Sequence, residues 1–315
     1  MAAAIALAER GRGRTWPNPA VGCVIEKDGR VIGRGWTQSG GRPHAEAMAL
    51  AEAGAAARGA TVYVTLEPCA HDSARGPACA DLLIAAGVAR VAIAIGDPDP
   101  RTDGRGIARL RAAGIAVETE VAADAADAGL AGFLTRQRLG RPHVTLKLAL
   151  SLDGAIALAD GSSQWITGEA ARAHAHVERA KADLILVGRG TFAADAPRLD
   201  VRLPGLEARA PRRVLLSRTM AAPDGWIAIT DPAAIADLPG DTLLVEGGAS
   251  VAAAFLAADL VDRLLIYRAP ILVGGGRGLG AIGLGDLAEA HGRWRALDSR
   301  RLGEDRLDIY SRNRS

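Results

Sequence analysis

The stretch HAEAMALAEAGAAARGATVYVTLEPC, residues 44–69, places an Ala- and Leu-rich segment directly before a β-branched one. We expect residues 45–53 to form a helix, because this segment holds strong helix formers. We expect residues 61–66 to form a strand, because these residue types favour a pleated surface. The same alternation of short β-rich runs and Ala/Leu-rich runs continues along the chain. This pattern predicts an α/β protein.

The first half of the chain ends at a sequence that is typical of a helix end. A helix expected over residues 123–139 is followed by Gly140-Arg141-Pro142, which ends a helix and begins a turn. We place a domain boundary there, dividing the chain into residues 1–140 and residues 141–315. The other elements expected before it are helices over 5–9, 80–86 and 106–113, and strands over 21–25, 31–35, 91–95 and 115–121, the first two joined by the hairpin signal Asp28-Gly29.

The second half shows no internal repeat of the first, which indicates two different domains on one chain. Its expected strands cover residues 144–150, 184–187, 214–216, 242–245, 264–267 and 307–310, and its expected helices cover residues 169–179 and 250–257.

Charge and composition argue against nucleic-acid and membrane partners. The 38 basic and 36 acidic residues leave a formal charge of only +2, and aromatic residues make up 3% of the chain. A near-neutral protein with few stacking side chains is a poor binder of nucleic acid. The longest apolar run, residues 247–258, is shorter than the ~18 residues that span a bilayer. Three cysteines without an export signal predict a reducing, cytoplasmic compartment.

Four residues at the ends of expected elements suggest a catalytic zinc site. His44 opens a helix, Cys69 follows a strand and Cys79 precedes another helix. One imidazole and two thiolates give zinc three protein ligands and leave its fourth position for water. Glu46, two residues from His44, would then shuttle protons while the activated water displaces ammonia from a ring carbon. The alternative is a buried histidine with two core cysteines, and the complete ordered set argues against it, whereas Cys23 is expected in the core.

A second site is suggested by Val245-Glu246-Gly247-Gly248-Ala249-Ser250, where a strand ends in glycines and a helix begins. The backbone amides at such a helix start can bind a phosphate. A tight turn without a ligand is an equal alternative on spacing alone. Gly188-Arg189-Gly190 lacks the third glycine and the acidic partner of a dinucleotide-binding fingerprint.

These motifs together resemble one known family. TWPNPAVG (15–22), HAE (44–46), EPCAH (67–71) and PAC (77–79), followed by KLALSLDG (147–154), SQWIT (163–167) and VEGG (245–248), are similar to the bifunctional riboflavin-biosynthesis deaminase–reductases. The resemblance implies an N-terminal cytidine-deaminase-like α/β/α domain and a C-terminal dihydrofolate-reductase-like α/β domain. It implies deamination of 2,5-diamino-6-(5-phosphoribosylamino)pyrimidin-4-one, and then NADPH reduction of the ribosyl side chain to ribityl.

For the deaminase domain, the resemblance implies that Zn²⁺ is held by His44, Cys69 and Cys79. It implies Glu46 as the proton shuttle, and Asn18 and His71 as pyrimidine contacts. The family usually has one residue fewer between its cysteines and a threonine–proline pair before the second. Because residues 71–77 depart from that pattern, we expect Arg75 to contact the substrate phosphate.

For the reductase domain, the resemblance implies a cofactor and a substrate subsite. NADPH contacts are expected at Ala149, Trp165, Thr191, Asp195, Ser217, Gly248, Ala249 and Ser250. Substrate contacts are expected at Ser163, Arg179, Leu199, Arg202 and Glu246, with the two arginines suited to a ribose 5-phosphate. The acid–base candidates are Lys147, Asp195 and Glu246, and the candidates for reading the cofactor's extra phosphate are Arg189 and Arg218. His174 and His176 are expected to be surface or packing residues.

Two other functions are compatible with part of this pattern. An RNA-editing deaminase shares the zinc residues, although the charge and aromatic content argue against it. A degenerate second half would serve only as an oligomerisation scaffold. We therefore expect a cytoplasmic enzyme with a small phosphoribosylated pyrimidine substrate, assembled as a homo-oligomer, either a dimer or a tetramer.

Overall fold

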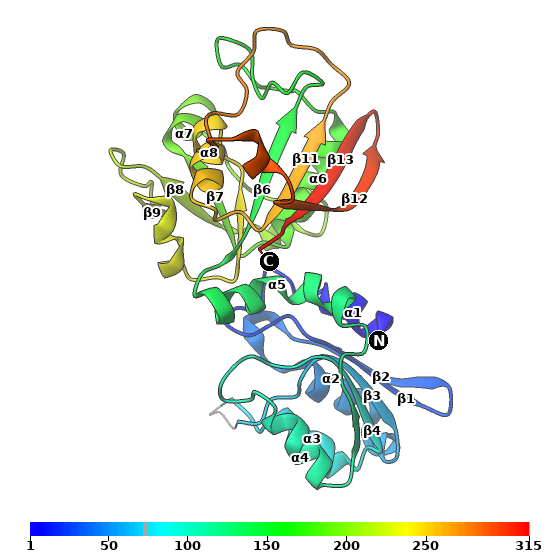
Figure 1. The fold of residues 1–315 in the computed structure, drawn as a ribbon. Helices are drawn as coiled ribbons and strands as arrows, with labels where there is room; N and C mark the ends of the chain where they lie inside the picture. The colour runs from blue at the N-terminus through cyan, green and yellow to red at the C-terminus, as the bar shows by residue number, and fades with distance from the viewer. Residues whose placement is uncertain (72–74, 315) are drawn as a thin grey trace. The chain divides into compact units, whose positions relative to one another are not determined.

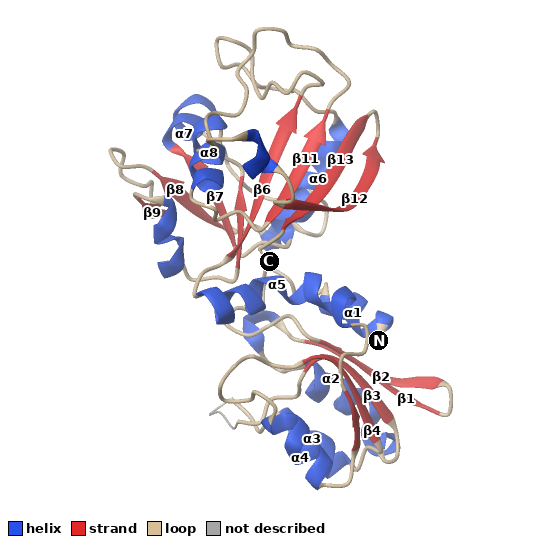
Figure 2. Ribbon diagram, in the orientation of Figure 1, coloured by secondary structure: helices blue, strands red, loops and turns tan. Residues whose placement is uncertain are grey.

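The computed structural model describes residues 1–71 and 75–314. It divides into two compact units, Met1–Gly140 and Arg141–Ser315 (Figure 1). Each unit is built on one sheet with helices packed against it (Figure 2). Each is described by itself below.

The first unit contains a five-stranded sheet of order β2-β1-β3-β4-β5. Its strands are β1 (Gly22–Lys27), β2 (Arg30–Trp36), β3 (Thr61–Leu66), β4 (Arg90–Ile95) and β5 (Ala116–Glu118). β1 pairs antiparallel with β2 and with β3, whereas β3, β4 and β5 are parallel. The turn between β1 and β2 has positive φ angles at Asp28 (52°) and Gly29 (76°). These angles suit the tight hairpin that Asp-Gly predicts.

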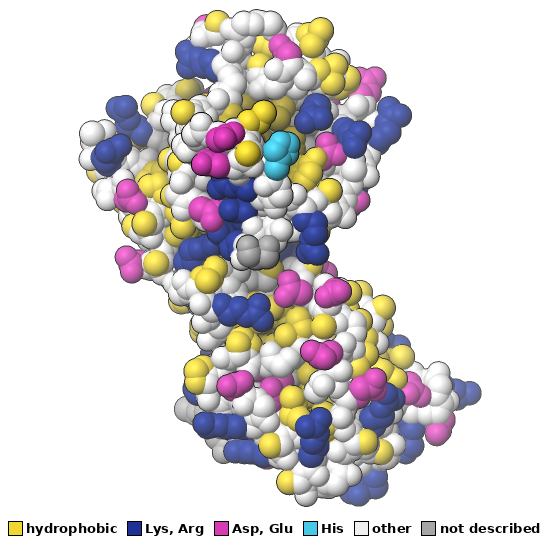
Figure 3. Space-filling view, viewed as in Figure 1, with side chains coloured by type: hydrophobic (Ala, Val, Ile, Leu, Met, Phe, Trp, Pro, Cys, Tyr) yellow, Lys and Arg dark blue, Asp and Glu magenta, His cyan; other side chains and the backbone are white. Residues whose placement is uncertain are grey.

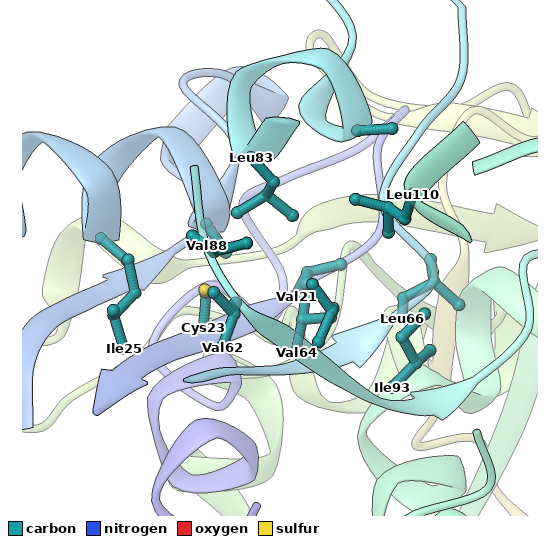
Figure 4. Packing of buried hydrophobic residues seen from close by; sticks show 14 of the residues in the cluster. Val21, Cys23, Ile25, Val62, Val64, Leu66, Leu83, Val88, Ile93 and Leu110 are labelled. Atoms are coloured by element: carbon teal, nitrogen blue, oxygen red, sulfur yellow. The ribbon is translucent and has the colours of Figure 1, made fainter. Parts of the chain in front are cut away.

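The helices of the first unit are α1 (Ala2–Ala8), α2 (Ala45–Ala53), α3 (Cys79–Ala86), α4 (Arg105–Ala112) and α5 (Ala123–Leu139). The core lies between helices and sheet, and Figure 4 shows Leu83 of α3 beside Cys23, Val62 and Val64 of the strands. Cys23 is fully buried, in agreement with its expected core position. Glycine allows α2 to lie close against β2, because a Cβ on Gly35 would come within 2.0 Å of the Ala45 carbonyl oxygen. This contact positions the first turn of α2.

The second unit contains an eight-stranded sheet of order β12-β13-β11-β6-β10-β7-β8-β9. Its strands are β6 (His143–Leu150), β7 (Leu184–Gly188), β8 (Arg212–Leu216), β9 (Ile227–Ile229), β10 (Thr242–Val245), β11 (Arg263–Arg268), β12 (Trp294–Leu302) and β13 (Asp305–Arg312). The strands from β11 to β9 in this order are parallel, and β12 and β13 form an antiparallel hairpin at one edge.

The helices of the second unit are α6 (Glu169–Ala180), α7 (Arg189–Asp195) and α8 (Ala249–Ala257). The main core cluster includes Leu146, Leu186 and Val245 from three neighbouring parallel strands and Phe255 from α8. Parallel strands covered on both faces carry nearly continuous apolar runs, which is why the central strands were predictable. The sequence analysis missed β9, β12 and α7. β9 is only three residues long, and β12 is exposed along almost its whole length, so it carries no apolar alternation.

The surface carries both signs of charge, and Figure 3 shows basic and acidic side chains interspersed on the visible face of each unit. Among the described residues, no helix has both the length and the apolar character needed to cross a membrane.

Candidate functional site

The structure brings His44, Cys69 and Cys79 together in the first unit. His44 is the N-cap of α2, Cys79 is the first residue of α3, and Cys69 follows β3. The His44 Nδ1 atom lies 3.3 Å from the Cys79 Sγ atom and 3.7 Å from the Cys69 Sγ atom. Tetrahedral zinc with usual bond lengths separates a nitrogen and a sulfur ligand by about 3.6 Å. The donor set and its spacing therefore fit a zinc ion.

Of the two thiols, Cys69 is the one held as a thiolate, whereas the hydrogen bond to Cys69 and burial raise the pKa of Cys79. The Cys79 backbone amide donates a hydrogen bond to the Cys69 sulfur at 3.3 Å. The hydrogen bond from the Cys79 side chain is the main cause that lowers the pKa of Cys69 to about 4. A thiolate is the form that binds a metal ion.

Glu46 lies in the first turn of α2, beside the ligand cluster. Its side chain is 3% exposed and lines the same pocket as His44 and Cys69. Burial raises the pKa of Glu46 to about 7. A carboxyl group with a pKa near neutrality can both accept and donate a proton at physiological pH.

Asn18 contacts His44 on the side away from the sulfur atoms. The Asn18 Nδ2 atom lies 2.8 Å from the His44 Nε2 atom. Gly41 holds this arrangement: its φ is +84°, and a Cβ there would lie 2.8 Å from the Asn18 Cγ atom. When Nδ1 binds a metal, Nε2 must carry the ring proton, so the Asn18 amide must then turn Oδ1 instead of Nδ2 toward Nε2 to accept the hydrogen bond. The sequence analysis predicted Asn18 only as a pyrimidine contact and missed this histidine contact.

A pocket of about 180 Å³ opens on this cluster. The predicted residues Asn18, His71 and Arg75 all line it, and residues 72–74 of the altered segment lie outside the described residues. Arg75 donates a hydrogen bond to the Gly40 carbonyl oxygen at 2.6 Å. Two lining arginines were missed: Arg101, which contacts both carboxylate oxygens of Asp99, and Arg42, which precedes a proline and carried no motif signal.

Glu67 fixes the position of two backbone segments beside this pocket. Its buried carboxylate accepts backbone hydrogen bonds from Asp97 (3.2 Å), Gly104 (3.1 Å) and Ile107 (3.1 Å). Gly106 must be glycine, because a Cβ there would lie 2.1 Å from the Pro68 carbonyl oxygen. Glu67 therefore fastens the start of α4 and the segment after β4 to the strand end that carries Cys69.

The second unit contains a larger pocket of about 450 Å³, a size typical of small-molecule sites. It brings together most of the residues predicted for the reductase. These are Lys147, Ala149, Ser163, Trp165, Arg179, Thr191, Asp195, Leu199, Arg202, Glu246 and Gly248.

Glu246 is a buried carboxylate that lies close to two cationic side chains of this pocket. It is bidentate to Arg179, with Nε–Oε1 and Nη2–Oε2 distances of 2.7 and 2.9 Å, and the Lys147 Nζ atom lies 3.9 Å from its Oε2 atom. Burial alone would raise the pKa of Glu246, but Arg179 and Lys147 together lower it, so the carboxylate stays charged. Two cations and one anion therefore share this end of the pocket.

The glycine turn after β10 is tied to α7. The Gly248 amide donates a hydrogen bond to the Thr191 hydroxyl at 3.1 Å. A Cβ on Gly247 would lie 2.5 Å from the Val251 Cβ atom, so the turn needs glycine for packing. At the rim, Gln164 Nε2 donates to Asp195 Oδ1 at 3.2 Å, and Trp165 is 63% exposed. An exposed indole in a pocket lining can stack against a flat ring.

Some predicted residues lie outside this pocket. Ser217 follows β8, and its hydroxyl accepts backbone hydrogen bonds from Thr219 and Met220 in a turn. The pocket lining also omits Ala249, Ser250, Arg189 and Arg218.

The two histidines of α6 have different positions. His176 is partly buried and lines the pocket beside Arg179 and Arg202, a position that the sequence analysis did not assign to it. His174 does pack: its Nδ1 atom lies 2.8 Å from the buried Tyr267 hydroxyl. Residues three or four positions apart lie on the same face of a helix. His174 and His176 are only two positions apart, so their side chains point in different directions.

Comparison with known proteins identifies relatives of both units. Residues 1–95 match the family model "Cytidine and deoxycytidylate deaminase zinc-binding region", and residues 142–307 match the "RibD C-terminal domain". The riboflavin biosynthesis protein RibD of Escherichia coli is 40% identical, covering 97% of this chain and 96% of the relative. That of Mycobacterium tuberculosis is 42% identical, covering 94% and 91%.

Solved structures agree over the whole length. Acinetobacter baumannii RibD, form 1, has a TM-score of 0.90 and 37% identity, covering 99% of this chain and 97% of that one. A Thermotoga maritima protein described as a diaminohydroxyphosphoribosylaminopyrimidine deaminase/5-amino-6-(5-phosphoribosylamino)uracil reductase has a TM-score of 0.87 and 32% identity, covering 98% and 97%.

Proposed function

The chain belongs to the RibD family of bifunctional riboflavin-biosynthesis deaminase–reductases, and on that premise we propose that it catalyses two consecutive steps on one substrate. The first is hydrolytic deamination of 2,5-diamino-6-(5-phosphoribosylamino)pyrimidin-4-one, carried out by residues 1–140. The second is NADPH reduction of the ribosyl side chain to ribityl, carried out by residues 141–315. The observation that carries the proposal is the presence of two separate pockets, each lined by the residues its reaction needs.

In the deaminase pocket, His44, Cys69 and Cys79 would hold Zn²⁺. The ion would supply Lewis acidity that activates a water molecule for attack at neutral pH. Glu46 accepts a proton as the water oxygen attacks the ring carbon that bears the amino group. Glu46 then delivers a proton to the amino nitrogen, which leaves as ammonia while a carbonyl remains on the ring. Burial keeps this carboxyl group at a pKa that suits both transfers.

Substrate contacts surround these groups. Asn18 and His71 lie where they can bind the pyrimidine edge, and Asn18 also orients His44. Arg75 and Arg42 line the same pocket and supply the positive charge that a phosphate requires.

In the reductase pocket, NADPH would supply a hydride to the ring-opened sugar carbon. Ala149, Trp165, Thr191, Asp195 and Gly248 line one region of the pocket, which we assign to the cofactor. The cofactor's additional phosphate would need a cation, for which Arg189 and Arg218 remain candidates.

The substrate occupies the remaining part of the reductase pocket. We assign to Lys147 the donation of the proton that balances the hydride, because it lines the pocket with its Nζ atom 3.9 Å from the Glu246 Oε2 atom. Arg179 fixes Glu246, and Arg202 faces the sugar phosphate. This intact charge arrangement argues against a second half that serves only as a scaffold.

The test follows the two products separately. Incubation with the diaminopyrimidine phosphate alone should release ammonia without NADPH oxidation, and adding NADPH should then give one NADPH oxidised per ammonia. Ammonia release without later NADPH oxidation would refute the reductase assignment. NADPH oxidation without ammonia release would refute the order of the steps. The cytoplasmic location and the homo-oligomeric state stay predictions, and analytical ultracentrifugation would test the latter.

A further inference from the structure

His176 is an ionisable residue of the reductase pocket to which the reaction above gives no role. It lies on α6 and lines the pocket together with Arg179, one turn further along the same helix. Arg202 and Asp200 face it from the segment that follows α7. The site therefore lies at the end of the pocket that holds the arginines assigned to the sugar phosphate.

The contacts of the imidazole leave one nitrogen for a ligand. The His176 Nδ1 atom lies 3.1 Å from the Asp200 carbonyl oxygen, and the Arg202 backbone amide lies 3.3 Å from the same Nδ1 atom. A protonated Nδ1 donates to the carbonyl, and an unprotonated Nδ1 accepts from the amide. Nδ1 thus has a protein partner in either state. Among the described residues, no hydrogen-bond partner is found for Nε2.

The charged groups around His176 are already paired with one another. Arg179 is neutralised by the bidentate contact with Glu246, and it also donates to the Asp200 carbonyl oxygen at 3.0 Å. Arg202 Nε lies 3.4 Å from Asp200 Oδ1, and Arg198 Nε lies 3.1 Å from Asp200 Oδ2. Counting Lys147, these side chains carry four positive and two negative charges, but each arginine is engaged by a carboxylate. A phosphate dianion must therefore compete with Glu246 and Asp200 for the arginines, whereas it meets no such competition at the His176 Nε2 atom.

We propose that His176 binds the sugar phosphate of the reductase substrate and takes up a proton when the phosphate dianion binds. The inference rests on the proposed function, because it assumes a phosphorylated substrate in this pocket. In the free protein, burial, Arg179 and Arg202 lower the pKa of His176, so the imidazole is neutral at pH 7. A bound dianion opposes the effect of the arginines and favours the imidazolium. Protonated Nε2 then donates a charge-assisted hydrogen bond to the phosphate.

The proposal predicts a pH dependence of substrate binding. Above pH 7 the phosphate is already a dianion, since its second pKa is about 6. Binding that takes up one proton weakens by up to about tenfold per pH unit in this range. The KM of the reductase should therefore rise with pH, whereas the kcat should not show this pH dependence.

The experiment compares full-length wild type with His176→Gln in the reductase reaction between pH 6.5 and 8.5. Glutamine keeps a hydrogen-bond donor but cannot titrate. We expect the ratio of the variant's KM to the wild-type KM to be about threefold at pH 6.5 and to approach one at pH 8.5. His174→Gln is the matched control, because this neighbouring imidazole contacts Tyr267 and is absent from the pocket lining. A KM ratio that does not change with pH, or a loss confined to kcat, would overturn the proposal.

A second measurement separates this proposal from the proposed function. NMR would follow the His176 ring resonance with and without ribose 5-phosphate, and we expect the phosphate to raise the His176 pKa by about one unit. An unchanged pKa under saturating ribose 5-phosphate would overturn the role of His176. If wild type failed to oxidise NADPH with the deaminated substrate, the proposed function would fail, and the NMR result would still decide on His176.

Discussion

At the scale of single residues, Glu46 separates metal binding from proton transfer. It is not one of the clustered ligand residues, so Glu46→Gln should keep the zinc and the fold. Loss of a positioned acid–base group should lower the rate of ammonia release by about 10²–10⁴-fold. Metal analysis and an ammonia assay would measure both, with Cys79→Ser as the variant that should lose zinc. Ammonia release within a few-fold of wild type would show that Glu46 is not the proton shuttle.

Asn18 is the residue that we expect to set the orientation of His44. Asn18→Leu has a similar shape but cannot accept the Nε2 proton, so zinc affinity should fall by about 10–100-fold. Asn18→Asp keeps an acceptor and should retain most of the affinity. Competition with a chelator measures this directly and does not depend on turnover. Equal zinc affinity in wild type and Asn18→Leu would limit Asn18 to substrate binding.

For single residues, the sequence predicted which side chains take part in the chemistry better than it predicted which neighbours they contact. The zinc residues stood out because His, Glu and Cys occurred in order at the ends of predicted elements, and the structure clusters them. The contact between Asn18 and His44 spans 26 positions and depends on the turn at Gly41, so no local pattern reveals it. The place of His176 in a pocket could not be predicted, because helical position alone did not show that α6 borders one.

At the scale of elements, Glu67 connects β3 to the segment after β4 and to the start of α4. Glu67→Gln replaces one acceptor oxygen with an NH₂ group that opposes a backbone amide. Leaving a buried amide unsatisfied costs about 1–3 kcal/mol, and urea unfolding should show a decrease of this size in the free energy of unfolding. Glu52→Gln is the control: its pair with Arg34 is exposed, and such pairs contribute about 0–1 kcal/mol. Equal effects of the two substitutions would contradict the role of Glu67.

The helices and strands with buried apolar residues were predicted best from the sequence. The helices Ala45–Ala53 and Ala123–Leu139 and the strands Thr61–Leu66 and Thr242–Val245 have the expected bounds, because apolar patterns and stop signals coincide there. The β-strand Trp294–Leu302 carries mainly exposed polar residues and forms through pairing with β13, which is a tertiary contact that local sequence does not encode.

At the scale of the whole molecule, the two units should function separately. Among the described residues, the core clusters of one unit contain no residue of the other, and the division falls between Gly140 and Arg141. Arg141 belongs to the second core region, since it is buried and bidentate to Asp262 at 2.7 and 2.8 Å. Asp262 also accepts the Val144 amide at the start of β6.

A fragment of residues 141–315 should therefore fold and bind NADPH without zinc. The same fragment carrying Arg141→Leu should be less stable by about 1–3 kcal/mol, because the buried Asp262 carboxylate loses its bidentate partner and keeps the Arg314 contact at 3.0 Å. Thermal unfolding and cofactor titration of both fragments would measure this difference. In the full chain, Glu246→Gln should impair NADPH oxidation while ammonia release continues at the wild-type rate. A loss of ammonia release in Glu246→Gln, together with a 141–315 fragment that binds no NADPH, would contradict two independent sites. Equal affinity for NADH and NADPH would instead remove only the choice of cofactor.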